Sequence, residues 1–201
     1  REAVFKILAK ESLSIHEKLI VILDMGSKIQ QCINTDEYDN IKSVVNDYLK
    51  EGIAHTLDET RNLSDSGQFE DISLQQGIRQ ILYPYEEMEV LNPEWEVILK
   101  DIIDSLFEQM SDEEYNILNE EFGTYMVSRA YEYRQLLEYL VFRYFAKSIY
   151  DYDFLGKCQM LVTNFFVIRQ MDIIRWLDNH REYSFKDRMD VVHIFSRQVE
   201  Y

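Results

Sequence analysis

The stretch Glu132–Trp176 constrains the fold of this chain most, because it combines the composition of a protein interior with many charged side chains. Helical spacing would turn eight of these charges toward that interior: Glu138, Arg143, Asp151, Asp153, Lys157, Arg169, Asp172 and Arg175. Burying a charge without a partner is costly. The segment therefore either joins its own helices through ion pairs or lines a polar site.

Two helices are expected here, over about residues 125–150 and 153–179, and apolar side chains cover almost the whole circumference of each. A helix that is apolar on all sides is surrounded by other helices. We therefore expect Glu138 and Arg143, which lie within the first helix, to be at least partly buried.

Charged residues at the junction and in the second helix have the spacing of structural partners. Asp153 is placed to cap the second helix, and Asp151 to reach a neighbouring arginine. Asp172 is spaced to pair with both Arg169 and Arg175 along one helix face.

Helical patterns also fill the rest of the chain. Only six Gly and two Pro occur among 201 residues, and good helix formers dominate. Ser14–Glu17 and Ser111–Glu114 are capping boxes, and Asn92–Glu94 combines a cap residue, a first-turn proline and an acid. No alternating run is long enough for a strand. We predict an all-α fold, an irregular bundle of about nine helices with a central apolar helical hairpin.

The length of the chain suggests one domain or two small ones, and we predict a single all-α domain over residues 1–201. A helix that begins after Asp36 is expected to stop at Gly52. Residues 62–68 are the most loop-like segment and the expected hinge between a front sub-bundle, 1–62, and a back sub-bundle, 69–201. The chain opens at Arg1 without an initiator Met, as expected of a fragment of a longer protein.

The formal net charge of −16 excludes nucleic acid as a partner, because phosphates require a basic surface. Residues 86–121 hold 13 acidic residues and one basic residue, Lys100. Such a run is either a solvated helical face or a surface that attracts a lysine-rich partner. The longest uncharged apolar run, Met160–Ile168, is too short to cross a bilayer, so no membrane partner is expected.

Short motifs of several enzyme classes are missing from the sequence. It contains neither a phosphate-binding glycine loop nor a nucleophile elbow. Cys32 and Cys158 lie far apart, which favours two buried thiols and leaves a disulfide open. Asp190 and His193 have the spacing of a metal-binding pair, but the further ligands of such a site are missing, so no metal is expected.

Five phrases that keep their order over nearly the whole chain resemble the flagellin lysine-N-methylase family of bacteria. They are REAVFKILAKESLSIHEKLIVILDMGSKIQ (1–30), MEVLNPEW (88–95), EYLVFRYFAKSIYDYD (138–153), IRW (174–176) and HIFSRQVE (193–200). The resemblance implies transfer of methyl groups from S-adenosylmethionine to the ε-amines of flagellin lysines. It also implies flagellin as the partner and a bacterial, cytoplasmic location.

The same resemblance places an iron–sulfur cluster in an N-terminal cysteine-rich region of the family. Two isolated cysteines cannot ligate such a cluster, so this chain resembles the C-terminal helical portion. We predict that it is the substrate-recognition or scaffold part of a lysine N-methyltransferase. The alternative is a non-catalytic acidic helical module that binds a basic protein. The parent is expected to be an enzyme, and the activity of the fragment alone is left open.

Lysine methylation needs a neutral amine in a site that excludes water, oriented by a carboxylate or a tyrosine hydroxyl, and aromatic faces tolerate the cationic sulfonium. Five residues of the central segment are of these types: Glu138, Tyr139, Asp151, Tyr152 and Asp153. The candidate polar site comprises Glu138, Tyr139, Arg143, Asp151, Asp153, Arg175, Arg197 and Glu200. We interpret the central segment as a hairpin stabilised by internal ion pairs, with a site at the Asp151–Asp153 turn as the alternative. The resemblance assigns no catalytic residue.

Overall fold

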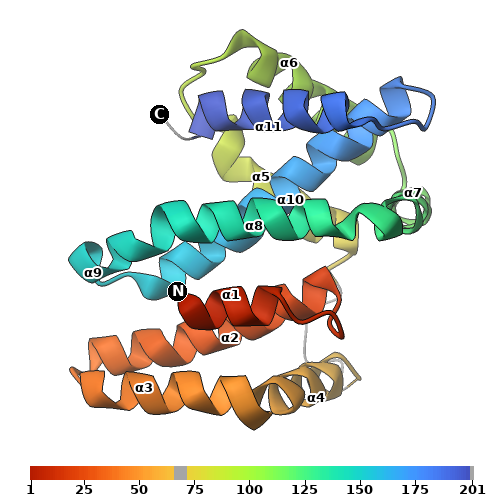
Figure 1. The fold of residues 1–201 in the computed structure, drawn as a ribbon. Helices are drawn as coiled ribbons and strands as arrows, with labels where there is room; N and C mark the ends of the chain where they lie inside the picture. The colour runs from red at the N-terminus through yellow and green to blue at the C-terminus, as the bar shows by residue number, and fades with distance from the viewer. Residues whose placement is uncertain (66–71, 200–201) are drawn as a thin grey trace. The chain divides into compact units, whose positions relative to one another are not determined.

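A computed structural model describes residues 1–65 and 72–199 of the chain. These residues form eleven α-helices and no strand, which confirms the predicted all-α class (Figure 1). The helices are α1 (Glu2–Leu8), α2 (Ile15–Asn34), α3 (Tyr38–Asp47), α4 (Ile53–Asp65), α5 (Leu74–Glu86), α6 (Pro93–Ile102), α7 (Asp112–Met126), α8 (Ala130–Tyr144), α9 (Ser148–Asp151), α10 (Phe154–Asp178) and α11 (Phe185–Val199). None of these helices combines the length and the apolar character of a membrane span.

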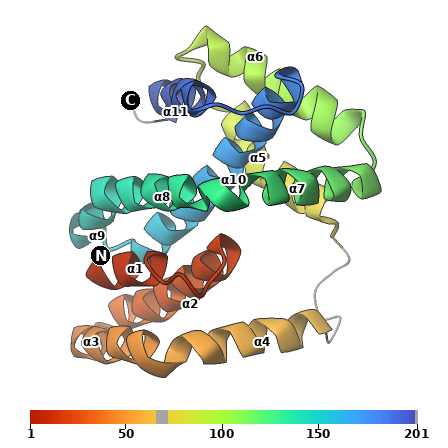
Figure 2. The same cartoon turned by 45° about the vertical axis from the view of Figure 1, so that its right-hand side comes forward.

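Short segments of tighter or wider helix extend several of the α-helices. Two are π-helical: η1 (Tyr48–Gly52), which joins α3 to α4, and η2 (Ile103–Glu108), which continues α6. Two are 3₁₀-helical: η3 (Val127–Arg129), which precedes α8, and η4 (Phe145–Lys147), which joins α8 to α9. Figure 2 shows α3 and α4 as one continuous rod.

The predicted helix end at Gly52 is wrong, because η1 carries the chain into α4. Tyr48 and Ile53, on either side of the glycine, are both buried. Their packing outweighs the roughly 1 kcal/mol by which a glycine weakens a helix. Residues 62–65 of the predicted loop belong to α4, and residues 66–68 lie outside the described part of the chain.

The chain forms two compact units, each assembled from two stretches. Unit 1 comprises residues 1–71 and 128–162, and unit 2 comprises residues 72–127 and 163–201. Helix α10 begins in unit 1 and ends in unit 2. The single domain, with its front and back sub-bundles, stays a prediction.

Unit 1 is built around α2, which contacts α1, α3, α4 and α8. Figure 1 shows α1, α2 and α3 side by side. The predicted capping box begins α2: the Ser14 hydroxyl accepts from the Glu17 amide, and the Glu17 carboxylate accepts from the Ser14 amide. Farther along α2, the Asp24 carboxylate accepts hydrogen bonds from Tyr48 and, at 2.6 Å, from the Thr56 hydroxyl. Asp24 thereby fixes the position of the rod formed by α3, η1 and α4.

A glycine lets α2 and α10 approach closely in unit 1. A Cβ atom on Gly26 would lie 2.7 Å from the sulfur of Cys158, well inside van der Waals contact. Cys158 is fully buried, and burial raises the pKa of its thiol to about 12. Cys32 is also buried, and both cysteines are free, so the prediction of two buried thiols is confirmed.

Aromatic side chains form much of the core of unit 2. Trp95 of α6 is buried against Tyr85 of α5 and Phe195 of α11, with ring centroids 6.2 Å away in both cases. Phe122 of α7 packs on Trp176 of α10 at 5.4 Å. The predicted caps are also present, since α7 has its capping box at Ser111 and α6 has its cap at Asn92. Figure 2 shows α6 beside α11, in line with their contacts.

Polar groups cross-link α10 to its neighbours inside unit 2. Asp172, fully buried, accepts a 2.6 Å hydrogen bond from the guanidinium of Arg188 on α11 and another from the Tyr183 hydroxyl. The Tyr115 hydroxyl of α7 donates to Gln170 at 2.8 Å. These bonds satisfy groups that would otherwise destabilise the interior. The ion-pair partner of Asp172 is thus Arg188 of α11, which lies outside the predicted hairpin, so a hairpin held by its own ion pairs stays a prediction.

Helix α8 differs from the expectation that it is surrounded on all sides. Phe142 is 66% exposed, and Arg143 and Tyr139 are exposed as well. The Arg1 guanidinium lies 5.5 Å from the centre of the Phe142 ring, a distance at which the two form a cation–π pair on the surface. Apolar composition does not require burial, because folded proteins expose many apolar side chains.

Candidate functional site

The residues of the predicted polar site are divided between the two units. Unit 1 holds Glu138, Tyr139, Arg143, Asp151 and Asp153, whereas unit 2 holds Arg175 and Arg197. Glu200 lies outside the described residues.

Glu138, Tyr139 and Arg143 lie on the more open side of α8. The Glu138 carboxylate is 3.6 Å from the Arg134 guanidinium, one turn earlier on the same helix. The Arg143 guanidinium lies 5.7 Å from the centre of the Tyr144 ring. Tyr139 is 44% exposed. Glu138, Tyr139 and Arg143 line neither of the two cavities described below, so a site at these residues stays a prediction.

Asp151 and Asp153 hold the turn between α9 and α10. The Asp153 carboxylate accepts from the Gly156 amide at 2.8 Å, which confirms its predicted role as a cap of α10. The Asp151 carboxylate accepts from the Asp153 amide at 3.1 Å and from the Lys157 ammonium at 2.5 Å. Its partner is thus a lysine rather than the predicted arginine. The Lys157 hydrogen bond is the main reason why the pKa of Asp151 is lowered.

A glutamine from α2 completes this turn. The side-chain oxygen of Gln30 accepts from the amides of Phe154 at 2.8 Å and Leu155 at 3.1 Å, which are free donors at the start of α10. Its side-chain nitrogen donates to the Tyr152 carbonyl at 2.9 Å. Residues that are more than 120 positions apart therefore fix the turn, a link that spacing along one helix could not indicate.

Tyr152 has a left-handed backbone, with φ 55° and ψ 21°. This conformation is unfavourable for a residue with a large side chain, and glycine is the usual residue at such a helix end. Tyr152 is 59% exposed and lines a cavity of about 410 Å³ in unit 1.

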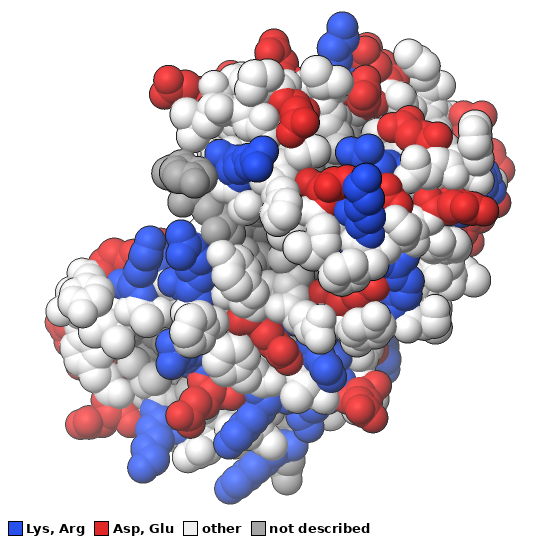
Figure 3. All heavy atoms as spheres, turned by 45° about the horizontal axis from the view of Figure 1, so that its top comes forward, with Lys and Arg blue, Asp and Glu red and all other residues white. Residues whose placement is uncertain are grey.

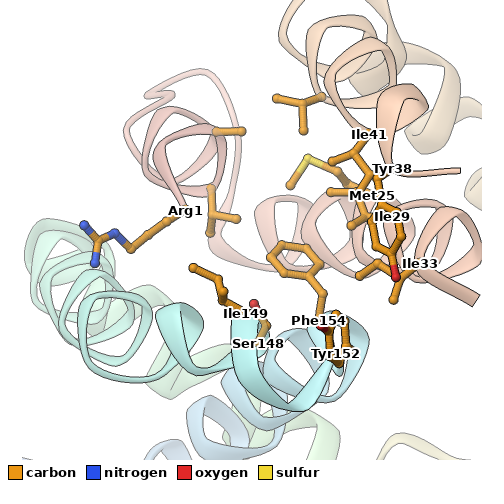
Figure 4. A pocket seen from close by; sticks show the side chains of 13 residues that line it. Arg1, Met25, Ile29, Ile33, Tyr38, Ile41, Ser148, Ile149, Tyr152 and Phe154 are labelled. Atoms are coloured by element: carbon orange, nitrogen blue, oxygen red, sulfur yellow. The ribbon is translucent and has the colours of Figure 1, made fainter. Parts of the chain in front are cut away.

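Helices α1, α2, α3 and α9 and the start of α10 enclose this cavity, which we call the aromatic cavity (Figure 4). Its lining is mostly apolar: Arg1, Ala3, Val4, Met25, Ile29, Ile33, Tyr38, Ile41, Val45, Ser148, Ile149, Tyr152 and Phe154. Figure 4 shows the Phe154 ring near the middle of these side chains, Tyr38 and Tyr152 to one side of it, and the Arg1 guanidinium directed away. The sequence indicated Tyr152 as one of five residues of suitable type but did not indicate the cavity.

Arg175 lines a groove of about 290 Å³ in unit 2, which we call the acidic groove. Its lining comes from α6, α10 and α11: Glu94, Val97, Ile98, Asp101, Ile174, Arg175, Asp178 and Ile194. The three isoleucines are buried and form an apolar floor, while the three carboxylates are exposed. No hydrogen bond or ion pair occupies these carboxylates within the described residues. Arg197 is exposed on α11 and does not line the groove.

Electrostatics and shape suit the acidic groove to an amphipathic cation. The methylene stem of a lysine side chain packs well on apolar surface, while its ammonium needs acceptor oxygens. The acid-rich run over residues 86–121 indicated this region from sequence, but only the structure shows that Asp178 of α10 also lines the groove. Figure 3 shows that acidic and basic side chains are interspersed on the face it displays, so the charge of the chain is not one uniform field there.

Neither cavity fits S-adenosylmethionine, the cofactor that the resemblance implies. The cofactor presents an ammonium and ribose hydroxyls that need acceptors, but the described lining of the aromatic cavity contains no carboxylate. The Ser148 hydroxyl there already donates to the Phe145 carbonyl at 2.7 Å. The described lining of the acidic groove has carboxylates but no aromatic face for the sulfonium. We therefore assign no step of methyl transfer to these residues.

Metal ligation has no support in the described residues either, since they contain no group of three or more His, Cys, Asp or Glu side chains arranged to hold an ion.

Comparisons with known proteins identify the chain at the level of its family. No curated protein and no solved structure matches it. One family model, described as the FliB lysine N-methylase C-terminal domain, matches residues 1–201, in agreement with the resemblance found in the sequence. The chain belongs to the FliB lysine N-methylase C-terminal domain family.

Proposed function

We propose that this domain recognises lysine-bearing segments of flagellin for a lysine N-methylase that uses S-adenosylmethionine. The observation that carries the proposal is the family match over the whole chain, because the family is named for modification of lysine. The acidic groove supplies a surface that fits the side chain to be recognised.

The groove offers both halves of what a lysine side chain needs. Ile98, Ile174 and Ile194 present an apolar floor for the four methylenes. Asp101 and Asp178 come from different helices, α6 and α10, so an ammonium can be held from two sides. Exposed ion pairs contribute little individually, about 0.2–1 kcal/mol. Affinity for flagellin therefore requires several lysine contacts or further apolar burial.

The same chemistry supports recognition over methyl transfer. Transfer requires a neutral lysine amine in line with the methyl donor. Carboxylates around an amine favour its charged form and so oppose deprotonation. The acidic groove is thus suited to capture of the charged substrate, and the transfer step belongs to another part of the parent enzyme.

A second candidate is an acidic module that binds basic proteins without regard to their identity. It is supported by residues 86–121, where 11 of the 13 acidic side chains are exposed. Diffuse attraction of this kind is screened over about 8 Å at physiological salt and depends steeply on ionic strength. Binding in a defined groove depends on particular carboxylates and on the apolar floor.

Calorimetric titration with purified flagellin separates the two candidates. The double variant Asp101→Asn/Asp178→Asn removes charge from the groove, and Glu113→Gln/Glu120→Gln removes equal charge from exposed positions on α7. The proposal predicts that only the groove variant weakens binding, by roughly three- to tenfold at 150 mM salt. Equal loss in both variants would favour the diffuse acidic module. Absence of flagellin binding by the unmodified chain would refute both.

A further inference from the structure

The aromatic cavity has no role in the function proposed above, and one residue in it is unfavourable for the fold alone. Tyr152 ends α9 in the left-handed region, where an aromatic side chain costs free energy that a glycine would avoid. The residue is 59% exposed, so packing of Tyr152 within the chain offsets little of that cost. Strain of this kind concentrates at functional sites.

The backbone of the turn is nevertheless firmly held. The Tyr152 amide donates to the Ser148 carbonyl at 3.0 Å, and its carbonyl accepts from Gln30 at 2.9 Å. The position of the ring at the cavity is therefore defined by contacts that do not involve the ring itself. A residue without a side chain could keep both bonds.

Three aromatic rings line the cavity: Tyr38, Tyr152 and Phe154. Phe145 packs edge-on against Phe154 with ring centroids 5.6 Å apart, which restricts the motion of the Phe154 ring. The Tyr38 hydroxyl donates to the Asp36 carboxylate at 3.2 Å. The volume of about 410 Å³ lies within the range of small-molecule sites, roughly 300–1,000 Å³.

The chemistry of this lining selects one kind of cation. A primary ammonium must keep three hydrogen bonds, and the described lining offers no carboxylate to accept them. A methylated ammonium has fewer N–H groups, or none, and interacts well with aromatic faces. Among the described residues of the lining, Arg1 carries the one basic side chain, and it is directed away from the rings in Figure 4. The net charge of −16 favours the approach of cations in general.

We infer that the aromatic cavity of unit 1 binds the methylated ammonium group of a methyl-lysine side chain. The inference rests on the proposed function, because a lysine N-methylase produces this group. Unmodified lysine is recognised at the acidic groove and methylated lysine at the aromatic cavity, so the two sites are tested by different ligands and different variants.

The test is a titration of the whole chain, followed by NMR, with lysine amides acetylated on the α-nitrogen. The ligands carry an ε-ammonium, an ε-trimethylammonium or, as a matched neutral probe, a tert-butyl group of the same shape. The trimethylated ligand is expected to bind at least about tenfold more tightly than the other two. Equal binding of the neutral probe would show an unselective apolar cavity and overturn the inference. Tighter binding of the unmethylated ligand would do the same.

Variants at the turn provide the second arm. Tyr152→Gly removes the ring and the strain together, so the melting temperature should rise while binding of the trimethylated ligand falls by about tenfold or more. Tyr152→Phe keeps the ring and should bind within about twofold of the unmodified chain. Tyr150→Ala removes a ring that is 86% exposed and lies outside the lining, so binding should not change.

Tyr152→Asn, which also tolerates the left-handed region, serves if the glycine variant is poorly folded. Full binding by Tyr152→Gly or Tyr152→Asn would refute the assignment. Competition by S-adenosylmethionine with the affinity of the trimethylated ligand would also refute it and would indicate a cofactor sulfonium site. Neither result depends on whether unmodified flagellin binds, which tests the proposed function separately.

Discussion

Replacement of Asp172 by Asn should strongly destabilise unit 2. Asp172 is fully buried and Arg188 is 5% exposed, and their hydrogen bond is 2.6 Å long. Removal of one partner from a buried ion pair leaves an uncompensated charge and costs about 3–5 kcal/mol. Asn keeps the shape of the side chain and an oxygen that can accept from Tyr183, which places the expected loss near the lower bound, about 3 kcal/mol. Asp172→Ala also leaves a cavity and should cost about 4–5 kcal/mol.

The assay is urea unfolding followed by far-ultraviolet circular dichroism, with the free energy of unfolding taken from the midpoint and slope. Asp178→Asn is the matched control, because Asp178 is exposed on the same helix and its replacement should change stability by less than about 0.5 kcal/mol. The double variant Asp172→Leu/Arg188→Met should lose much less than the sum of the two single variants, since an apolar pair carries no desolvated charge. A loss below about 1 kcal/mol for Asp172→Asn, or additive losses in the double variant, would refute this reasoning.

Three further predictions concern unit 1. Gly26→Ala places a methyl group 2.7 Å from the Cys158 sulfur and should lower the free energy of unfolding in urea by about 1–3 kcal/mol. The double variant Gly26→Ala/Cys158→Ala should restore part of this loss, and full stability of the single variant would contradict the close contact. Burial raises the pKa of the Cys158 thiol to about 12, so at pH 8 its alkylation should occur only at the rate of unfolding. Mass spectrometry measures this rate, and rapid labelling of the native chain would be inconsistent with burial. The hydrogen bonds from Ser14 lower the pKa of Glu17 below its ordinary value of 4.5. The ionised carboxylate therefore stabilises the fold above about pH 4.5, and this stabilisation is lost as pH falls through the lower native pKa. Glu17→Gln should reduce the dependence of stability on pH in this range, and an unchanged dependence would argue against the capping box.

Local features of this protein were predictable from sequence because their causes are local. The capping boxes at Ser14 and Ser111 and the cap at Asp153 depend on residues three apart, and the structure has all three. The all-α class follows in the same way from helix formers and scarce glycine.

Long-range partners were not predictable, because helical spacing says nothing about neighbouring helices. The Arg188 partner of Asp172 lies 16 residues away, beyond a turn in which His180 and Arg181 have positive φ. Gln30 reaches the start of α10 from α2. The candidate polar site stays a prediction, since its described residues are divided between the two units.

The two candidate cavities could be predicted from the sequence to different degrees. Two acidic residues of the groove, Glu94 and Asp101, belong to the acid-rich run over residues 86–121, whereas Asp178 lies outside that run. The aromatic cavity requires Tyr38 of α3 and Phe154 of α10 to face the same space, and a one-dimensional pattern cannot show this. Of the residues that line this cavity, the sequence suggested Tyr152, as one of five residues with the right chemistry to orient an amine.

The central claim is that the domain recognises the charged lysines of flagellin, and calorimetry with chemically acetylated flagellin tests it most directly. Acetylation removes the positive charge of each lysine and keeps the length of its stem. The account predicts measurable binding of unmodified flagellin at 150 mM salt and at least about tenfold weaker binding after acetylation. Equal affinity for the two forms would contradict it.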